Sequence, residues 1–161
     1  MKYLLVKPNL PLKVARRLHS LLHLEPLELE IVAGGIPEKH EIKILDLSLS
    51  RKPEKQFTCC VRNFNPDVIG FTAYSNQAKN VLKLAKLAKQ ELLEVINIVG
   101  GVHATIAPEY FAGCGDLDAI IRGEGGSIIA NFAESLDSGK GIPETESIIP
   151  IKSANFAKLA S

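Results

Sequence analysis

Two glycine-bearing loops hold the residues whose types and spacing are best suited to binding a ligand. Residues 100–103 have the sequence Gly-Gly-Val-His, and residues 122–125 have the sequence Arg-Gly-Glu-Gly. Each loop follows a short aliphatic run, at 95–99 and at 119–121. Glycine at the end of a strand allows unusual backbone dihedrals or the close approach of a ligand. We therefore expect a binding site where these two loops meet.

The elements that position these loops alternate between strand and helix patterns. Strands are predicted at 3–6, 41–47, 68–73, 95–99 and 118–121, with a short sixth at 148–151, and helices at 12–24, 27–33, 53–64, 76–93, 107–112 and 127–136. Such alternation predicts a doubly wound α/β fold, Rossmann-like and three-layered, with a parallel sheet in the flavodoxin-like order 2-1-3-4-5.

In this order the switch point lies between the first and third strands, and ligands bind at the carboxyl edge of the sheet. We expect a crevice there, walled by Pro8 and Asn9, by residues 72–75 and by the loop at 100–101. Asp46 and the loop around Gly123 are expected to flank this crevice.

Composition excludes several classes of partner. The chain has 161 residues, enough for one domain with a substantial core. A net charge of +1 and only 6% aromatic residues, none of them Trp, argue against nucleic acid or an anionic membrane as partner. Three cysteines form no disulfide framework, and no apolar run approaches a membrane span, so we expect a cytoplasmic protein.

The sequence does not contain the motifs for the ligands and reactions that are common in this fold. The first strand–helix turn, residues 7–11, is Lys-Pro-Asn-Leu-Pro, without the glycines of a dinucleotide or phosphate loop, so neither NAD nor ATP is expected to bind. Asn9 and Thr72 replace the acidic residues of a phospho-receiver domain. Adjacent Cys59 and Cys60 do not have metal-ligand spacing. The sequence therefore yields no catalytic and no metal-binding candidates.

Several motifs together resemble a known family. The segments 65–72, 100–105 and 118–125, with Pro108-Glu109 and Leu45-Asp46, are similar to the N-terminal cobalamin-binding domain of radical SAM enzymes. The resemblance covers roughly residues 3–136. It implies a domain at 1–140, followed at 141–161 by a tail or the start of a linker to a radical SAM domain.

The resemblance implies a cobalamin whose dimethylbenzimidazole tail is tucked into the carboxyl edge of the sheet. Gly100 and Gly101 would lie against this nucleotide tail, and Thr72 would lie near its base. The full set of cofactor-binding candidates is Asn9, Asp46, Thr72, Tyr74, Ser75, Gly100, Gly101, His103, Gly123 and Glu124.

Two departures from related families shape the expected function. Other cobalamin domains carry Asp-x-His-x-x-Gly, whose His ligates cobalt, but here Ser48 and Arg51 stand at the His and Gly positions. We therefore expect base-off cobalamin without a protein ligand on the metal. The Cys-x-x-x-Cys-x-x-Cys motif of the iron–sulfur cluster is not in the sequence, so cluster and SAM are expected in a catalytic domain outside this chain, on the same or a separate polypeptide.

Three function classes stay open. The first is the cobalamin-binding module of a radical SAM methyltransferase or related enzyme, not catalytic alone. The second is a cofactor-less docking or substrate-recognition domain of the same family. The third is an unrelated doubly wound enzyme. Single candidates also have structural alternatives: Thr72 could cap a helix, Asp46 could order a turn, and Glu124 could pair with Arg122.

Overall fold

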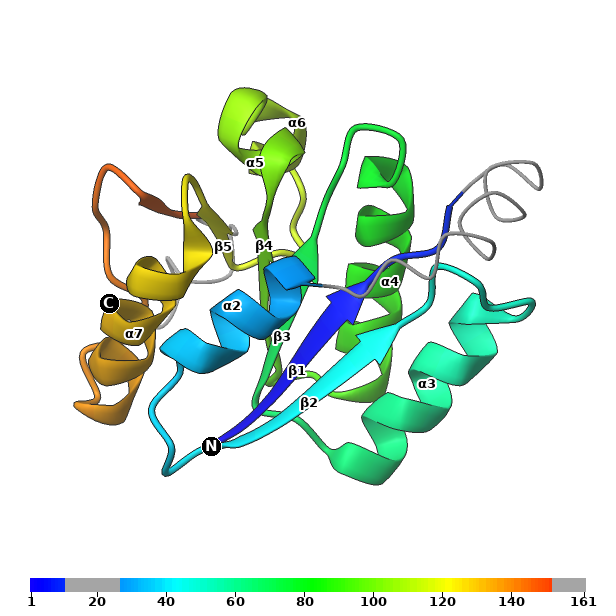
Figure 1. Cartoon of the computed structure of the whole chain (residues 1–161), viewed down its shortest axis with the longest axis horizontal. Coiled ribbons are helices and arrows are strands. Elements are labelled where there is room, and N and C mark those ends of the chain that lie inside the picture. Colours follow the sequence, from blue (N-terminus) through cyan, green and yellow to red (C-terminus); the bar gives the residue numbers. More distant parts are fainter. Residues whose placement is uncertain (11–26, 152–161) are drawn as a thin grey trace.

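The sheet has the predicted strand order. The computed structural model describes residues 1–10 and 27–151, and in these residues six strands form one sheet in the order β2-β1-β3-β4-β5-β6 (Figure 1). The strands are β1 Lys2–Lys7, β2 Glu41–Asp46, β3 Val68–Thr72, β4 Ile96–Gly100, β5 Ala119–Ile121 and β6 Ile148–Pro150. The first five are parallel, which confirms the order 2-1-3-4-5, and β6 is antiparallel to β5.

Helices cover both faces of this sheet, so the three-layer prediction is confirmed. They are α2 Leu27–Gly35, α3 Pro53–Phe64, α4 Ala78–Glu91, α5 Val102–Ile106, α6 Glu109–Ala112 and α7 Gly125–Asp137. Helices α2 and α7 lie on one face and α3 and α4 on the other, while α5 and α6 lie at the carboxyl edge (Figure 1). The helix expected at 12–24 lies outside the described residues. In the described part of the chain, no helix has the length and apolar character needed to cross a bilayer.

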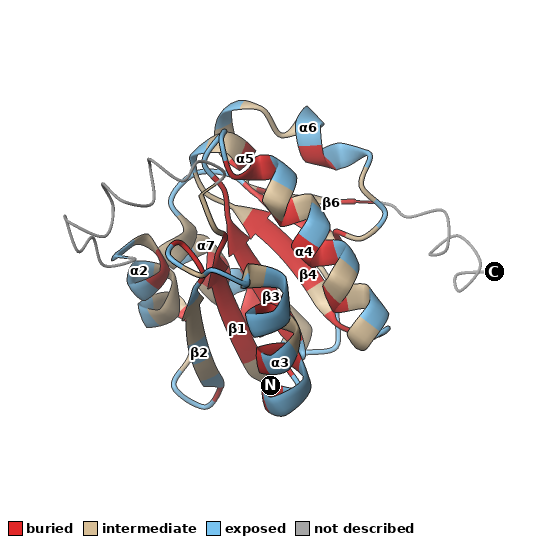
Figure 2. Cartoon of the chain, turned by 90° about the vertical axis from the view of Figure 1, so that its right-hand side faces the viewer, coloured by how far each residue is buried: buried red, intermediate tan, exposed pale blue. Residues whose placement is uncertain are grey.

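The alternation of side chains along the buried strands builds two cores. In β1, Leu4 and Val6 pack with α3 and α4, whereas Tyr3 and Leu5 pack with α2 and α7. Strands β1 and β3 are buried almost throughout (Figure 2). Burial on both faces explains why these strands are nearly continuous apolar runs rather than alternating ones.

The segment after β4 differs from its prediction. A single helix was expected at 107–112, but the structure has α5 from Val102 and a separate α6 from Glu109. Ala107 between them has φ −139° and ψ 58°. Pro108 causes this break, because the residue before a proline is sterically disfavoured in the helical region. The predicted range of 107–112 was therefore wrong for this segment, because it missed α5.

The sixth strand extends the sheet at its β5 edge. After α7 the chain turns through Gly139 and Gly141, both with positive φ. Ile148 then pairs with Ile121, and Pro150 with Ala119. The predicted strand at 148–151 is thus present, and it adds residues of the expected tail to the sheet.

Helices α2 and α7 approach each other closely through glycines. A Cβ atom built on Gly35 would overlap the carbonyl oxygen of Gly126. One built on Gly125 would lie 2.8 Å from Val32 Cγ2. The two backbones can therefore touch only because these positions carry no side chain.

Replacing Gly35 with Ala is expected to destabilise the fold by about 1–3 kcal/mol, because overpacking forces the two helices apart. The neighbouring Gly34→Ala is the matched control: its Cβ would meet nothing within 4 Å, and alanine favours a helix. Urea unfolding of both variants measures the difference. Equal stability of Gly35→Ala and the parent chain would contradict the close contact.

Candidate ligand-binding site

A cavity of about 680 Å³ lies between the sheet and the helix pair α2 and α7. It is lined by residues from the carboxyl halves of β3, β4 and β5, including Thr72, Gly100 and Ile121, and by residues at both ends of α5. This volume is within the range of cavities that hold small molecules and cofactors. The cavity opens at the carboxyl edge, the side of the sheet on which the sequence placed the site.

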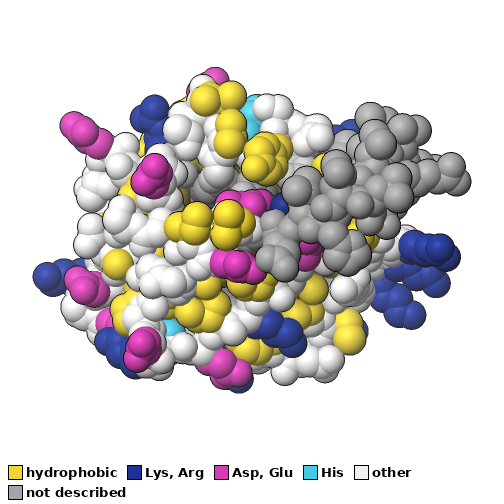
Figure 3. Space-filling model, viewed as in Figure 1, with side chains coloured by type: hydrophobic (Ala, Val, Ile, Leu, Met, Phe, Trp, Pro, Cys, Tyr) yellow, Lys and Arg dark blue, Asp and Glu magenta, His cyan; other side chains and the backbone are white. Residues whose placement is uncertain are grey.

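The floor of the cavity is aliphatic. Five aliphatic lining side chains are each at most 5% exposed: Leu5, Leu29, Ile98, Ile121 and Ile129. The mouth also carries apolar side chains, but these are exposed: Ile31, Val102 and Ile106. Figure 3 shows hydrophobic side chains gathered on this face, over α2 and above it over α5 and α6. An apolar surface of this kind is suited to a large, partly apolar ligand.

Two predicted glycines at the end of β4 line the cavity and play different parts. Gly101 has φ 91°, and a Cβ there would lie 2.9 Å from both Ala73 N and Thr72 Oγ1. The fold itself therefore requires glycine at 101, whatever the ligand. A Cβ on Gly100 would make only ordinary contacts with Ile121, at 3.7 and 3.8 Å. Gly100 is thus the position where a side chain would fill the cavity without distorting the backbone.

Thr105 joins the two glycine loops, and the sequence analysis missed it as a site residue. Its Oγ1 donates to Gly101 O at 3.0 Å and accepts from Gly123 N, also at 3.0 Å. One hydroxyl thus connects the start of α5 with the loop before α7, and Thr105 also lines the cavity. Its place in the 100–105 motif was the available signal, but the bond to Gly123 is long-range in sequence.

Five of the ten predicted residues line the cavity and five do not. The lining ones are Thr72, Gly100, Gly101, Gly123 and Glu124. The others lie at or after the ends of strands at the same edge, but outside the lining: Asn9, Asp46, Tyr74, Ser75 and His103. Tyr74 and Ser75 are exposed.

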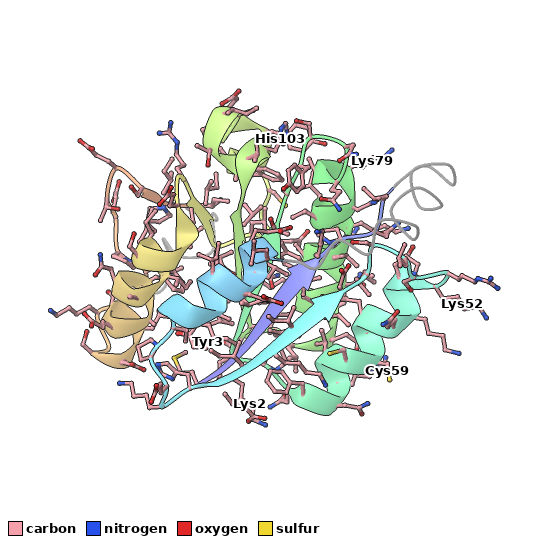
Figure 4. The ribbon with its side chains drawn as sticks, in the orientation of Figure 1. Lys2, Tyr3, Lys52, Cys59, Lys79 and His103 are labelled. Carbon is pink, nitrogen blue, oxygen red and sulfur yellow. The ribbon has the colours of Figure 1, made fainter. Side chains whose placement is uncertain are left out.

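His103 forms its contacts away from the cavity. Its Nδ1 lies 3.1 Å from Ser75 Oγ, and its ring makes edge contacts with the rings of Tyr110 and Phe111. Its Nε2 is shielded from solvent and has no hydrogen-bond partner in the described residues. Figure 4 shows His103 in α5 at the carboxyl edge of the sheet. Because both nitrogens face protein, the imidazole is not available to the cavity in this arrangement.

The crevice expected between β1 and β3 is bridged by side chains from the start of α4. Gln77 Nε2 donates to Pro8 O at 2.7 Å, and Asn80 Nδ2 donates to Asn9 O at 2.8 Å. These bonds fix the segment that follows β1, and neither Pro8 nor Asn9 lines the cavity. Asp46 orders the turn after β2, where its Oδ1 accepts from Ser48 N at 2.8 Å.

Helix α2 supplies a wall of the cavity that the sequence analysis did not assign. Glu28, Ile31 and Val32 line it. The Oε1 atom of Glu28 is shielded from solvent and lies 3.1 Å from Nζ of the buried Lys7, an ion pair without hydrogen-bond geometry. This pairing offsets the cost of burying the Lys7 ammonium at the end of β1.

Metal-ligating side chains do not gather in the described part of the chain. Within residues 1–10 and 27–151, no three His, Cys, Asp or Glu residues come together in a way that could hold an ion. Burial raises the pKa of the Cys60 thiol, which disfavours the thiolate that would bind a metal.

Removing the Thr105 hydroxyl is expected to loosen the loop around Gly123. Thr105→Val keeps the shape of the side chain but deletes both hydrogen bonds, each worth about 1 kcal/mol. We expect the Gly123 amide to exchange with solvent about five- to tenfold faster. Thr105→Ser, which keeps the hydroxyl, is the control. Hydrogen exchange followed by NMR is the measurement, and unchanged protection in Thr105→Val would refute the link.

Comparison with known proteins gives a consistent match. The family model described as B12 binding domain matches residues 15–133. An uncharacterized methyltransferase of Pyrococcus horikoshii is 30% identical over 116 residues, which cover 71% of this chain and 25% of the relative. The hopanoid C-3 methylase of Methylococcus capsulatus is 31% identical over 134 residues, 81% of this chain and 26% of the relative. The chain thus spans about a quarter of the length of these relatives.

A solved structure shares the fold. The cobalamin-dependent S-adenosylmethionine radical enzyme OxsB, with aqua-cobalamin and S-adenosylmethionine bound, superposes with a TM-score of 0.67 at 16% identity. The match covers 96% of this chain and 23% of OxsB. Together with the family match over most of the sequence, the glycine loops and the cavity at the carboxyl edge lead to one conclusion: the chain belongs to the B12-binding domain family.

Proposed function

We propose that this chain binds cobalamin and places the nucleotide tail of the cofactor in the cavity between the sheet, α2 and α7. The observation that carries the proposal is the form of the cavity, an aliphatic floor beneath a rim of bare backbone at Gly100, Gly101 and Gly123. An amphipathic tail needs an apolar surface for its base and open backbone along its path. Both are present within one cavity of adequate size.

The residues of this chain divide into two roles under this proposal. Thr72 and Glu124, with the three glycines, hold the tail, and the exposed Tyr74 and Ser75 are candidates for contact with the corrin. Three further candidates have hydrogen bonds within the protein that position the neighbouring loops: Asn9, Asp46 and His103.

We further propose that the chain is the cobalamin-binding module of a radical SAM enzyme of the methyltransferase type. The relatives named a methyltransferase and a methylase support this class. When bound, cobalamin supplies a cobalt centre for methyl transfer. The iron–sulfur cluster and SAM belong, in this proposal, to a catalytic domain outside these 161 residues, and the present chain binds and orients the cofactor.

The cofactor is expected to bind base-off, without a protein ligand on cobalt. Ser48, at the position of the ligating His of other cobalamin domains, is fully buried. The Nε2 of His103 is shielded from solvent. No imidazole is therefore presented at the cavity by either segment.

Titration of the chain with hydroxocobalamin, followed by visible absorption, tests cobalamin binding. We expect a saturable spectral change with a dissociation constant on the order of micromolar or weaker, because this domain encloses only part of the cofactor. Gly100→Leu is expected to weaken binding by more than about tenfold, because its side chain occupies the cavity. Gly113→Leu is the control, since a Cβ there meets nothing within 4 Å. Unimpaired binding by Gly100→Leu would contradict the placement of the tail.

Replacing His103 with Ala is expected to leave the spectrum of bound cobalamin unchanged, because the imidazole does not reach the metal. The same titration, compared between parent and variant, is the measurement. An imidazole-ligated cobalt spectrum that disappears in the variant would contradict base-off binding without a protein ligand. The absence of any spectral or calorimetric change with saturating cobalamin would instead favour the cofactor-less docking domain.

A further inference from the structure

The floor of the cavity bears on which corrinoid the chain selects. We propose that the cavity discriminates among corrinoids by the base of their nucleotide tail, and takes a benzimidazole in preference to a purine. This inference rests on the proposed function, because it assumes that the tail enters the cavity. It adds a specificity that depends on side chains of this chain.

The first observation is the arrangement of the floor across the sheet. Leu5, Gly70 and Ile98 are neighbours in register on β1, β3 and β4. Gly70 adds no side chain between the two aliphatic ones. Ile121 of β5 continues the floor, and Leu29 and Ile129 close it from the helices. A flat ring placed against these five side chains meets aliphatic groups.

The second observation concerns the polar side chains of the cavity, most of which are paired within the protein or lie at its mouth. The Thr105 hydroxyl is bonded to Gly101 O and Gly123 N. The Oε1 atom of Glu28 has no hydrogen-bond partner in the described residues, but the Lys7 ammonium 3.1 Å away balances its charge. Glu124 and Ser127 are exposed and lie at the start of α7.

Thr72 is the exception. Among the described residues that line the cavity, it is the single buried one with a polar side chain, at 6% exposed. Its hydroxyl can donate to one ring nitrogen. The floor therefore offers one hydrogen bond and an otherwise apolar surface.

The two kinds of base differ in what they need from such a floor. Dimethylbenzimidazole, once detached from cobalt, has one free ring nitrogen and an apolar edge with two methyl groups. Adenine has additional ring nitrogens and an exocyclic amine. A buried amine without a partner loses its bonds to water, which weakens binding by about tenfold or more. The methyl groups, in contrast, gain from burial against aliphatic side chains.

The experiment compares three corrinoids by visible-absorption titration of the full chain: cobalamin, its analogue with adenine as the lower base, and cobinamide, which has no nucleotide. We expect cobalamin to bind most tightly, with the adenine analogue weaker by about tenfold or more. Equal or tighter binding of the adenine analogue overturns the selectivity while leaving the proposed function intact. Cobinamide binding as tightly as cobalamin overturns the placement of the tail. The absence of a spectral change with any of the three corrinoids overturns the proposed function itself.

Two variants assign the selectivity to the floor. Ile98→Thr keeps a β-branched shape and adds a hydroxyl beneath the base, so we expect it to reduce the preference for cobalamin. Ile44→Thr makes the same change on β2, on the same face but outside the cavity lining, and should leave the preference unchanged. Glu28→Ala tests the competing account: a selective loss of the adenine analogue would show that Glu28 pairs with the amine, and would overturn the proposal.

Discussion

The close contact between α2 and α7 is the constraint on which the cavity side of this molecule depends. Each helix contributes one wall of the cavity, and the two walls meet where Gly35 approaches Gly126 and Gly125 approaches Val32. Side chains at these glycines would separate the helices and alter the distance between the walls. The shape of the cavity therefore depends on the lack of side chains at these glycines as well as on the residues that line it.

The two faces of the sheet are packed differently. On the α3 and α4 side, aliphatic and aromatic side chains form a buried cluster, in which the rings of Phe57 and Phe71 lie with their centroids 6.0 Å apart. On the α2 and α7 side, Gly70 leaves the middle of the sheet without a side chain. A cavity of this size removes packing contacts that a filled core would have. A molecule bound in the cavity would therefore add contacts on the α2 and α7 face that the protein itself does not supply.

Local sequence patterns were sufficient for the strands, their order and the edge of the sheet at which the cavity opens. Buried aliphatic runs mark β1, β3 and β4, and glycines mark the loops that follow β4 and β5. The patterns did not reveal how side chains distant in sequence meet. The bonds from Gln77 and Asn80 that bridge the expected crevice, and the bond from Thr105 to Gly123, depend on the packed structure. For the same reason, the patterns did not reveal that α2 forms a wall of the cavity. Its contact with α7 joins segments nearly one hundred residues apart.

The short strand β6 has a consequence for how this molecule meets other molecules. An edge strand with free backbone donors can pair with a strand of another chain. Along the outer side of β6, however, the Ile148 amide donates to Thr145 Oγ1 and its carbonyl accepts from Thr145 N. Pro150 has no amide hydrogen to offer. This margin of the sheet is thus closed to strand addition, so that self-association into extended β-structure is disfavoured there by the backbone itself.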